Sequence, residues 1–158
     1  MKIANVCFLI KDDKVLLAMK KRGFGVGKWN GVGGKVKEGE TIEESTIREA
    51  KEEIGVDIAP DDLEKVALNE FHFPDKDGWD MLVHCYIARK WKGEPTESEE
   101  MRPEWFKISE VPIDEMWSDD KYWFPQVLRG EKIKAEFNFI GAGEGVGKYT
   151  VDVVQGFE

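Results

Sequence analysis

The sequence has few residues that could support a disulfide framework, a zinc site or a membrane span. Among its 158 residues are two histidines and two cysteines, and Cys7 and Cys85 stand far apart in separate apolar runs. This spacing fits neither a disulfide scaffold nor a zinc site, so we expect two buried free thiols. No segment approaches the roughly 20 apolar residues that span a bilayer, and no small-residue cleavage site precedes Lys11. We therefore expect a cytoplasmic protein that does not enter a membrane.

Positive charge is also scarce. The chain has 23 lysines and arginines against 32 aspartates and glutamates, a formal net charge of -9. Binding to nucleic acid polymers depends on basic side chains that neutralise phosphates, so this charge argues against such a partner. A small anionic ligand is compatible with it if divalent cations accompany the ligand or a local basic patch receives it. The run Lys20-Lys21-Arg22 could form such a patch, although it could equally be only the basic end of a strand.

The length and the pattern of the chain indicate one domain over residues 1–158, which we expect to be monomeric. Apolar runs at 3–10 and 15–19 flank a polar turn and predict a hairpin. The segment Tyr122 to Arg129 predicts a short helix with Pro125 in its first turn, where the missing N–H is not needed. Further strands are expected at 64–71, 81–89, 103–108, 133–140 and 148–154. The fold class is therefore α+β, with a mixed sheet packed between helices.

A longer helix has clearly marked ends. Thr41 and Glu44 give the T-x-x-E capping-box pattern, and Gly55 stands where a carboxyl-terminal cap would end the helix. At 100° per residue, Ile47, Ala50 and Ile54 fall within about 60° of one another and predict an apolar stripe that packs on a sheet.

Three carboxylates lie roughly opposite that stripe. Glu49, Glu52 and Glu53 are three and four residues apart and would repel one another on one helix face. A solvated face neutralised in part by Arg48 and Lys51 is one interpretation. The other is a bound Mg²⁺ or Mn²⁺, because hard cations prefer carboxylate oxygens and commonly bridge protein to substrate phosphates.

The spacing of these carboxylates relative to the residues before and after them favours the metal site over the solvated face. Residues 34–56, GKVKEGETIEESTIREAKEEIGV, match the pattern G-x5-E-x7-R-E-U-x-E-E-x-G-U. This segment resembles the Nudix box, and it is far more restrictive than the glycine-rich stretch at 23–34, a weak motif taken alone. Ala50 is smaller than the bulky aliphatic residue that the box usually carries, yet it still belongs to the buried stripe.

The resemblance implies a Nudix fold, an α/β/α sandwich with a curved mixed sheet, and metal-dependent hydrolysis of a nucleoside diphosphate linkage. It implies that Glu52 and Glu53 are metal ligands and that Glu49 is a further ligand or orients the attacking water. Arg48 would hold Glu49 in place, and Gly33 would contribute its carbonyl.

Two further stretches, 19–36 and 97–125, resemble the MutT-type subgroup, which hydrolyses oxidised purine nucleoside triphosphates. This similarity implies that Glu100 is an additional metal ligand and that Lys20 lies near the base or the phosphates. The implied substrate-binding residues are Asn5, Lys20, Asn30, Gly34, Lys35, Phe71, Met81, Trp117, Asp119 and Asp120. Plainer interpretations exist for several of them, since Asn30 could be a turn residue, Trp117 a core residue and Asp119 a helix cap.

Asp119 and Asp120 have a chemical logic of their own. Adjacent carboxylates in an apolar pocket need not both ionise, so one can keep a proton and donate as well as accept. Such a pair could recognise an oxidised guanine or an oxidised adenine. We therefore expect broad purine specificity.

The sequence departs from the subgroup where specificity would be set. Asn5 replaces a small hydroxyl residue, and residues 71–81 differ in length and content, so that Asn5, Phe71, Phe73 or Met81 could reshape the pocket. Two other functions stay open. One is a Nudix pyrophosphatase for an unmodified nucleotide, ADP-ribose or a dinucleoside polyphosphate. The other is a nucleotide-sensing or partner-binding module without catalysis, against which the complete set of box glutamates argues.

Overall fold

Successive side chains of the first strand point alternately to the two faces of the sheet, and each face packs against a different apolar cluster. The computed structural model describes residues 1–157, and in it β1 (Lys2–Lys11) is buried over most of its length. Val6 and Phe8 belong to one apolar cluster, whereas Cys7 and Leu9 belong to the other. Because successive residues of a strand point to opposite faces, the central sheet has a core on each side.

The sheet itself is mixed, as predicted. Its order is β3-β2-β1-β5-β4-β7-β8, and β6 pairs with β2 beside this path. The β1–β5 and β4–β7 pairs are parallel, and the other pairs are antiparallel. The remaining strands are β2 (Lys14–Lys20), β3 (Trp29–Asn30), β4 (Leu63–His72), β5 (Met81–Ala88), β6 (Met101–Lys107), β7 (Lys132–Ile140) and β8 (Gly145–Val154). Every expected strand is present, and the short β3 within the glycine-rich stretch was not predicted.

Helix α1 (Ile42–Ile54) has the ends that the sequence predicts. The Thr41 hydroxyl accepts from the Glu44 N–H and the Glu44 carboxylate accepts from the Thr41 N–H, which completes the capping box. Gly55 ends the helix with φ 74°, in the left-handed region that favours glycine. Ala50 and Ile54 are fully buried in the cluster that contains Cys7 and Leu9. The apolar stripe therefore holds α1 against one face of the sheet.

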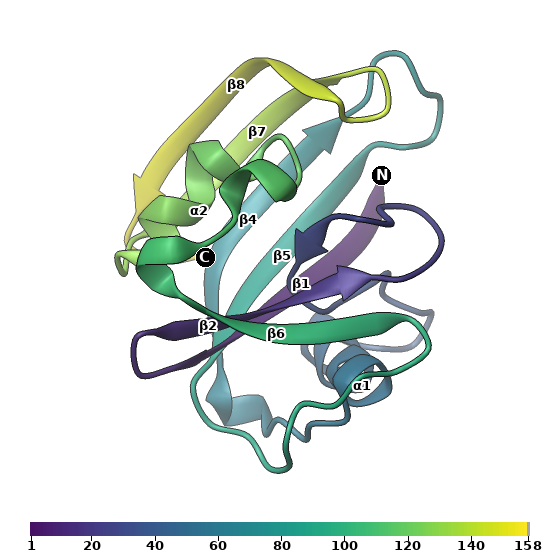
Figure 1. Cartoon of the computed structure of the whole chain (residues 1–158). Helices are drawn as coiled ribbons and strands as arrows, with labels where there is room; N and C mark the ends of the chain where they lie inside the picture. The colour runs from purple at the N-terminus through teal and green to yellow at the C-terminus, as the bar shows by residue number, and fades with distance from the viewer. Residues whose placement is uncertain (158) are drawn as a thin grey trace.

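Helix α2 (Asp120–Leu128) covers the other face. Trp123, Phe124 and Val127 are buried in the cluster that contains Phe8, and the Phe8 and Phe124 ring centroids are 4.5 Å apart. Figure 1 shows α2 beside β4 and β7, away from α1. The sheet lies between two helices, which is the α+β sandwich that was expected.

One detail of α2 was predicted wrongly. The helix begins at Asp120 rather than Tyr122, so Pro125 lies inside it and not in the first turn. A proline there forgoes one backbone hydrogen bond, and in helix interiors this costs about 3 kcal/mol. The burial of Trp123, Phe124 and Val127 offsets this cost, since each buried large apolar side chain contributes about 1.5–3 kcal/mol.

Both cysteines are buried free thiols, as expected. Within residues 1–157, no helix is long and apolar enough to cross a membrane.

Candidate active site

The loop before α1 is pressed against β1 at Gly33. A Cβ atom at this position would lie 2.1 Å from the carbonyl oxygen of Asn5, so only glycine fits. The backbone N–H of Gly33 donates to Oε1 of Glu53 at 2.9 Å. The loop thus covers the helix face that carries Glu53, whose residue is only 3% exposed. For Glu53 this geometry excludes the solvated-face interpretation.

Arg48 organises the carboxylates around this loop. Its Nε and Nη2 donate to the two carboxylate oxygens of Glu40, at 2.6 and 3.0 Å. Its Nη1 donates to Glu49 at 2.9 Å and to Glu52 at 3.2 Å. The hydrogen bonds from Arg48 lower the pKa of Glu40 to about 2. Arg48 is thus positioned to hold Glu49, in the manner that the resemblance implies.

The carboxylates converge on Glu53. Burial, together with the nearby charges of Glu49 and Glu100, raises the pKa of Glu53 to about 8. Glu100 comes from the segment before β6, far from α1 in the sequence. Oxygen donors from α1 and from this segment therefore meet beside the Gly33 loop, and such a donor set suits a hard divalent cation. These residues fit the metal that the Nudix box implies, although their roles as ligands remain a prediction.

A cavity of about 250 Å³ opens next to this loop. Gly33 and Gly34 belong to its wall, so the cavity adjoins the carboxylates. The wall includes all ten residues that the sequence proposed for substrate binding, namely Asn5, Lys20, Asn30, Gly34, Lys35, Phe71, Met81, Trp117, Asp119 and Asp120. Residues from distant parts of the chain are thus brought to one site beside the candidate metal ligands.

Two buried acidic groups lie in the cavity wall. Asp119 and Asp120 are each 3% exposed. Asp119 occupies the cap position of α2 but makes no capping bond, and it accepts instead from Nε1 of Trp123 at 2.8 Å. Burial raises the pKa of Asp119 to about 6, and burial together with the charge of Asp119 raises that of Asp120 well above its usual range. Because the pKa of both groups is raised, the pair can keep a proton and can then both donate and accept.

Other predicted residues differ in how they face the cavity. The Asn5 side chain donates to Ser45 Oγ at 2.9 Å and accepts from the Gly34 N–H at 3.4 Å, so its polar atoms face α1. This arrangement suits a residue that positions the loop, and a direct contact with substrate remains a prediction. In the basic run, Lys21 and Arg22 pair with glutamates of the 97–100 segment, whereas Lys20 lines the cavity.

Asn30 and Trp117 also have local partners. The Asn30 Oδ1 accepts from the Gly31 N–H at 2.8 Å, within the short strand β3 rather than in a turn. Phe24 packs against Trp117 with ring centroids 5.0 Å apart, and the Lys28 ammonium lies 5.6 Å from the centroid of the Trp117 ring.

Sequence reasoning missed several residues of the cavity wall. Phe24 and Lys28 lie in the glycine-rich stretch, whose motif is weak by itself, and their place beside Trp117 depends on the fold. Phe139 comes from β7 and stacks on Phe73 with ring centroids 4.8 Å apart. Asn69 is a polar residue at an inward-facing position of β4, and strand alternation could have identified it.

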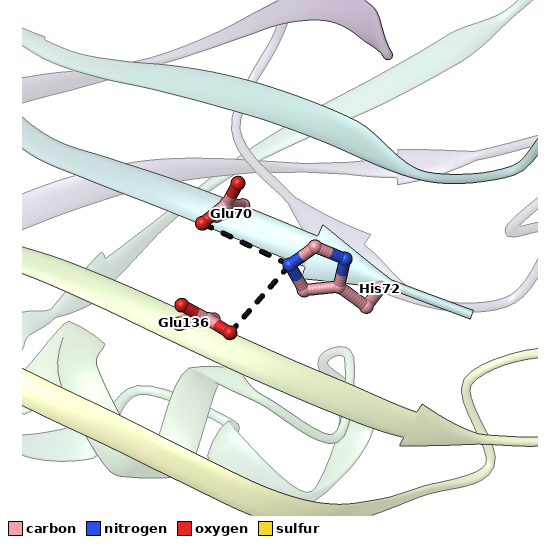
Figure 2. A group of neighbouring side chains, drawn as sticks. All are labelled: Glu70, His72 and Glu136. Carbon is pink, nitrogen blue, oxygen red and sulfur yellow. Dashed lines mark ion pairs between the residues drawn. The ribbon is translucent and has the colours of Figure 1, made fainter. Parts of the chain in front are cut away.

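A second group of potential metal ligands lies on the opposite face of β4. Glu70 and His72 alternate with the cavity residues of that strand, and Glu136 pairs with Glu70 across the β4–β7 register. Figure 2 shows one ring nitrogen of His72 facing both glutamates. This atom, Nε2, lies 3.7 Å from Glu70 and 3.6 Å from Glu136. Asp80 lies 3.0 Å from Nδ1, and its hydrogen bond is the main reason that the pKa of His72 is raised. When His72 is protonated, its charge offsets those of the neighbouring carboxylates, and the group is separate from the Nudix box.

Comparisons with known proteins agree with this geometry. The sequence profile of the NUDIX domain matches residues 1–127. The chain is 46% identical over 138 residues to the oxidized purine nucleoside triphosphate hydrolase of Mus musculus, covering 87% of this chain and 86% of the relative. It is 45% identical over 140 residues to the protein of the same name from Danio rerio, covering 89% and 88%. A crystal structure of a MutT protein from Bacillus halodurans superposes with a TM-score of 0.83 at 28% identity, covering 96% of this chain and 98% of that chain. The chain therefore belongs to the Nudix family of hydrolases.

Proposed function

We propose that this protein hydrolyses oxidised purine nucleoside triphosphates such as 8-oxo-dGTP. The products would be the nucleoside monophosphate and pyrophosphate, and the reaction would remove oxidised precursors from the nucleotide pool. Mg²⁺ is the expected metal, and Mn²⁺ could replace it. Identity of 45–46% to hydrolases of that name over most of the chain supports this substrate class.

One observation carries the proposal: the cavity that holds Asp119 and Asp120 adjoins the loop that contacts Glu53. A base in the cavity would direct its phosphates toward the carboxylates and their metal. A volume of about 250 Å³ suits a single base, because pockets for larger ligands usually measure about 300–1,000 Å³.

The roles of the residues follow from their contacts. Glu52, Glu53, Glu100 and the Gly33 carbonyl would hold the metal. When bound, the metal would stabilise charge on the phosphoryl group and make water a better nucleophile. Arg48 would fix the Glu49 carboxylate, which would be a further metal ligand or would orient the attacking water. Lys20 and Lys35 would attract the phosphates, and the two loop glycines would let the nucleotide approach the backbone.

The main alternative is a Nudix pyrophosphatase for another substrate. A dinucleoside polyphosphate would need room for a second base, beyond what a cavity of about 250 Å³ offers. A binding module without catalysis would not need Glu49, Glu52 and Glu53 together.

A substrate panel with Mg²⁺ tests the proposal. It should contain 8-oxo-dGTP, an oxidised dATP, the four unmodified dNTPs, ADP-ribose and a dinucleoside polyphosphate, with monophosphate and pyrophosphate measured separately. The proposal predicts the highest kcat/KM for the oxidised purines. Faster turnover of ADP-ribose would favour the alternative, and no product from any compound would favour the binding module. The cytoplasmic location and the monomeric state remain predictions, and light scattering of the purified protein tests the latter.

A further inference from the structure

Asn69 is a buried polar residue in the wall of the base cavity. It lies on β4, which runs between β5 and β7 in the sheet (Figure 1). Its side chain is on the same strand face as Phe71, which also lines the cavity. The residue is 0% exposed. An amide at such a position needs hydrogen-bond partners, because water does not reach it.

The nitrogen of this amide has a hydrogen-bond partner, whereas its oxygen has none among the described residues. Nδ2 donates to Cys85 Sγ at 3.7 Å, and that thiol in turn contacts the Val83 carbonyl at 4.0 Å. Oδ1 has no hydrogen-bond partner among residues 1–157. Because the thiol uses its proton toward Val83, its lone pairs can accept from Nδ2, which leaves Oδ1 as the free atom. A buried acceptor without a partner is costly, so a ligand that supplies a donor would gain from it.

The surroundings of Asn69 indicate which kind of ligand. Asp119 and Asp120 line the same cavity. Burial is the main cause that raises the pKa of the Cys85 thiol, and the charges of Asp120 and Asp119 raise it as well, so the two aspartates lie close to the partner of Asn69. The Asn69 acceptor therefore belongs to the part of the cavity that would read the base and not to the part that would hold phosphates. Because Oδ1 can only accept a hydrogen bond, it would favour a base with a donor at the facing position over a base with an acceptor there.

We propose that Asn69 is a specificity-determining residue whose Oδ1 accepts a hydrogen bond from the N7–H of an 8-oxopurine. The inference rests on the proposed function. An unmodified purine has an acceptor at N7, whereas oxidation at C8 places a proton there. Oδ1 would therefore attract the oxidised base and repel the unmodified one. Because 8-oxoguanine and 8-oxoadenine share the N7–H, one residue would serve both bases.

Asn69→Leu tests the inference, because leucine is close to asparagine in shape but has no acceptor. We expect kcat/KM for 8-oxo-dGTP and 8-oxo-dATP to fall roughly ten- to hundredfold, as for a hydrogen bond left unmade, and kcat/KM for dGTP to stay unchanged or to rise. The affinity for 8-oxo-dGMP, measured by calorimetry, should fall by the same factor. The melting temperature should not fall, because the variant removes an unpaired buried polar atom. If Asn69→Leu does not fold, Asn69→Ala takes its place.

Cys85→Ala is the matched control, since it removes the sulfur partner of Asn69 and keeps the amide. It should leave the ratio of kcat/KM for 8-oxo-dGTP over dGTP within about threefold of the unmodified protein. If Cys85→Ala lowered that ratio as strongly as Asn69→Leu, Asn69 would act only by supporting Cys85, and the inference would be wrong. Equal losses for 8-oxo-dGTP and dGTP in Asn69→Leu would also overturn it.

The same measurements distinguish failure of the proposed function from failure of the role proposed for Asn69. If the unmodified protein neither binds 8-oxo-dGMP nor prefers 8-oxo-dGTP, the proposed function falls and this inference falls with it. If the unmodified protein has the preference and Asn69→Leu retains it in full, only the role of Asn69 is excluded.

Discussion

The backbone N–H of Gly33 donates to Oε1 of Glu53, 2.9 Å away and twenty residues later in the chain. This bond ties the glycine loop to the helix of the Nudix box. It also connects the two parts of the site, because Gly33 lines the base cavity while Glu53 lies among the candidate metal ligands. The position of the base and the position of the metal are therefore mechanically linked.

Glu53→Gln should abolish most of the turnover while the protein stays folded. The amide keeps the shape of the side chain but removes the charge that would hold the cation, so we expect kcat to fall by about 100-fold or more. The free energy of unfolding of the metal-free variant should not fall, because burial already disfavours the ionised carboxylate, whose pKa is raised to about 8.

Thermal unfolding with and without MnCl₂ separates these effects. The metal should raise the melting temperature of the unmodified protein, since a ligand that binds only the folded state stabilises it, and this rise should be absent in Glu53→Gln. The exposed Glu64→Gln is the control for loss of one charge. Unimpaired turnover in Glu53→Gln would show that the metal site has been assigned wrongly.

Gly33→Ala should impair both stability and turnover. The added methyl group would meet the Asn5 carbonyl at 2.1 Å, and the loop would have to move away from β1. We expect a loss of about 1–3 kcal/mol in the free energy of unfolding, as for overpacking in a core, measured by urea denaturation. Gly145→Ala is the control, because its nearest neighbour would be the flexible Ile140 Cδ1 at 3.5 Å. Normal turnover in a fully stable Gly33→Ala would mean that the loop does not need this close contact.

The aspartate pair predicts a characteristic pH profile. Both carboxyl groups have a raised pKa, that of Asp119 about 6 and that of Asp120 well above its usual range. A carboxyl group whose pKa is raised on folding favours the folded state most at pH values below its ordinary pKa of 3.8. This contribution to the free energy of unfolding is lost as the pH rises through the pKa of the folded state. The kcat/KM for an oxidised purine should likewise fall at alkaline pH, where the pair loses its last proton.

Asparagine substitutions at the pair test this origin of the profile. Asp120→Asn carries a permanent donor, so its kcat/KM should vary less at alkaline pH than that of the unmodified protein. Asp119→Asn should lower kcat/KM for oxidised dGTP and oxidised dATP. If Asp119→Asn left both values unchanged, Asp119 would have no part in recognition.

His72 should make stability depend on pH without affecting catalysis. Its pKa is raised above 6.5, mainly by the hydrogen bond with Asp80. Its contribution is therefore fully present below pH 6.5 and is lost as the pH rises through the raised value. His72→Gln should cost about 1 kcal/mol at pH 6, since the pairs are partly exposed, and much less at pH 9. Equal losses at both values would indicate that packing, and not charge, is responsible. Turnover should not change, because His72 faces away from the cavity.

Local patterns were sufficient for the helix and most of the strands. The capping residues Thr41 and Gly55 fixed the ends of α1, and alternation of apolar residues identified the strands. Local patterns did not predict features that depend on tertiary packing. Burial of Trp123 and Phe124 extends α2 back to Asp120 and leaves Pro125 inside the helix, which local preferences do not favour.

For the candidate site, the Nudix box predicted the carboxylates, and the resemblance to the MutT-type subgroup predicted the residues that line the cavity. The arrangement around them depends on contacts between distant segments. Burial of Glu53 requires Gly33 to pack on β1, and the orientation of Asn5 toward Ser45 depends on the position of α1. The free acceptor of Asn69 becomes evident only when β4, β5 and α2 are brought together.

The most direct test of the proposed function is kcat/KM for 8-oxo-dGTP and dGTP, measured with the same preparation and with Mg²⁺. Differential recognition by buried polar groups predicts a preference of at least about tenfold for the oxidised nucleotide, with release of pyrophosphate. Equal values, or a preference for dGTP, would contradict the assignment of the cavity to oxidised purines, even if the protein proved to be an active Nudix hydrolase.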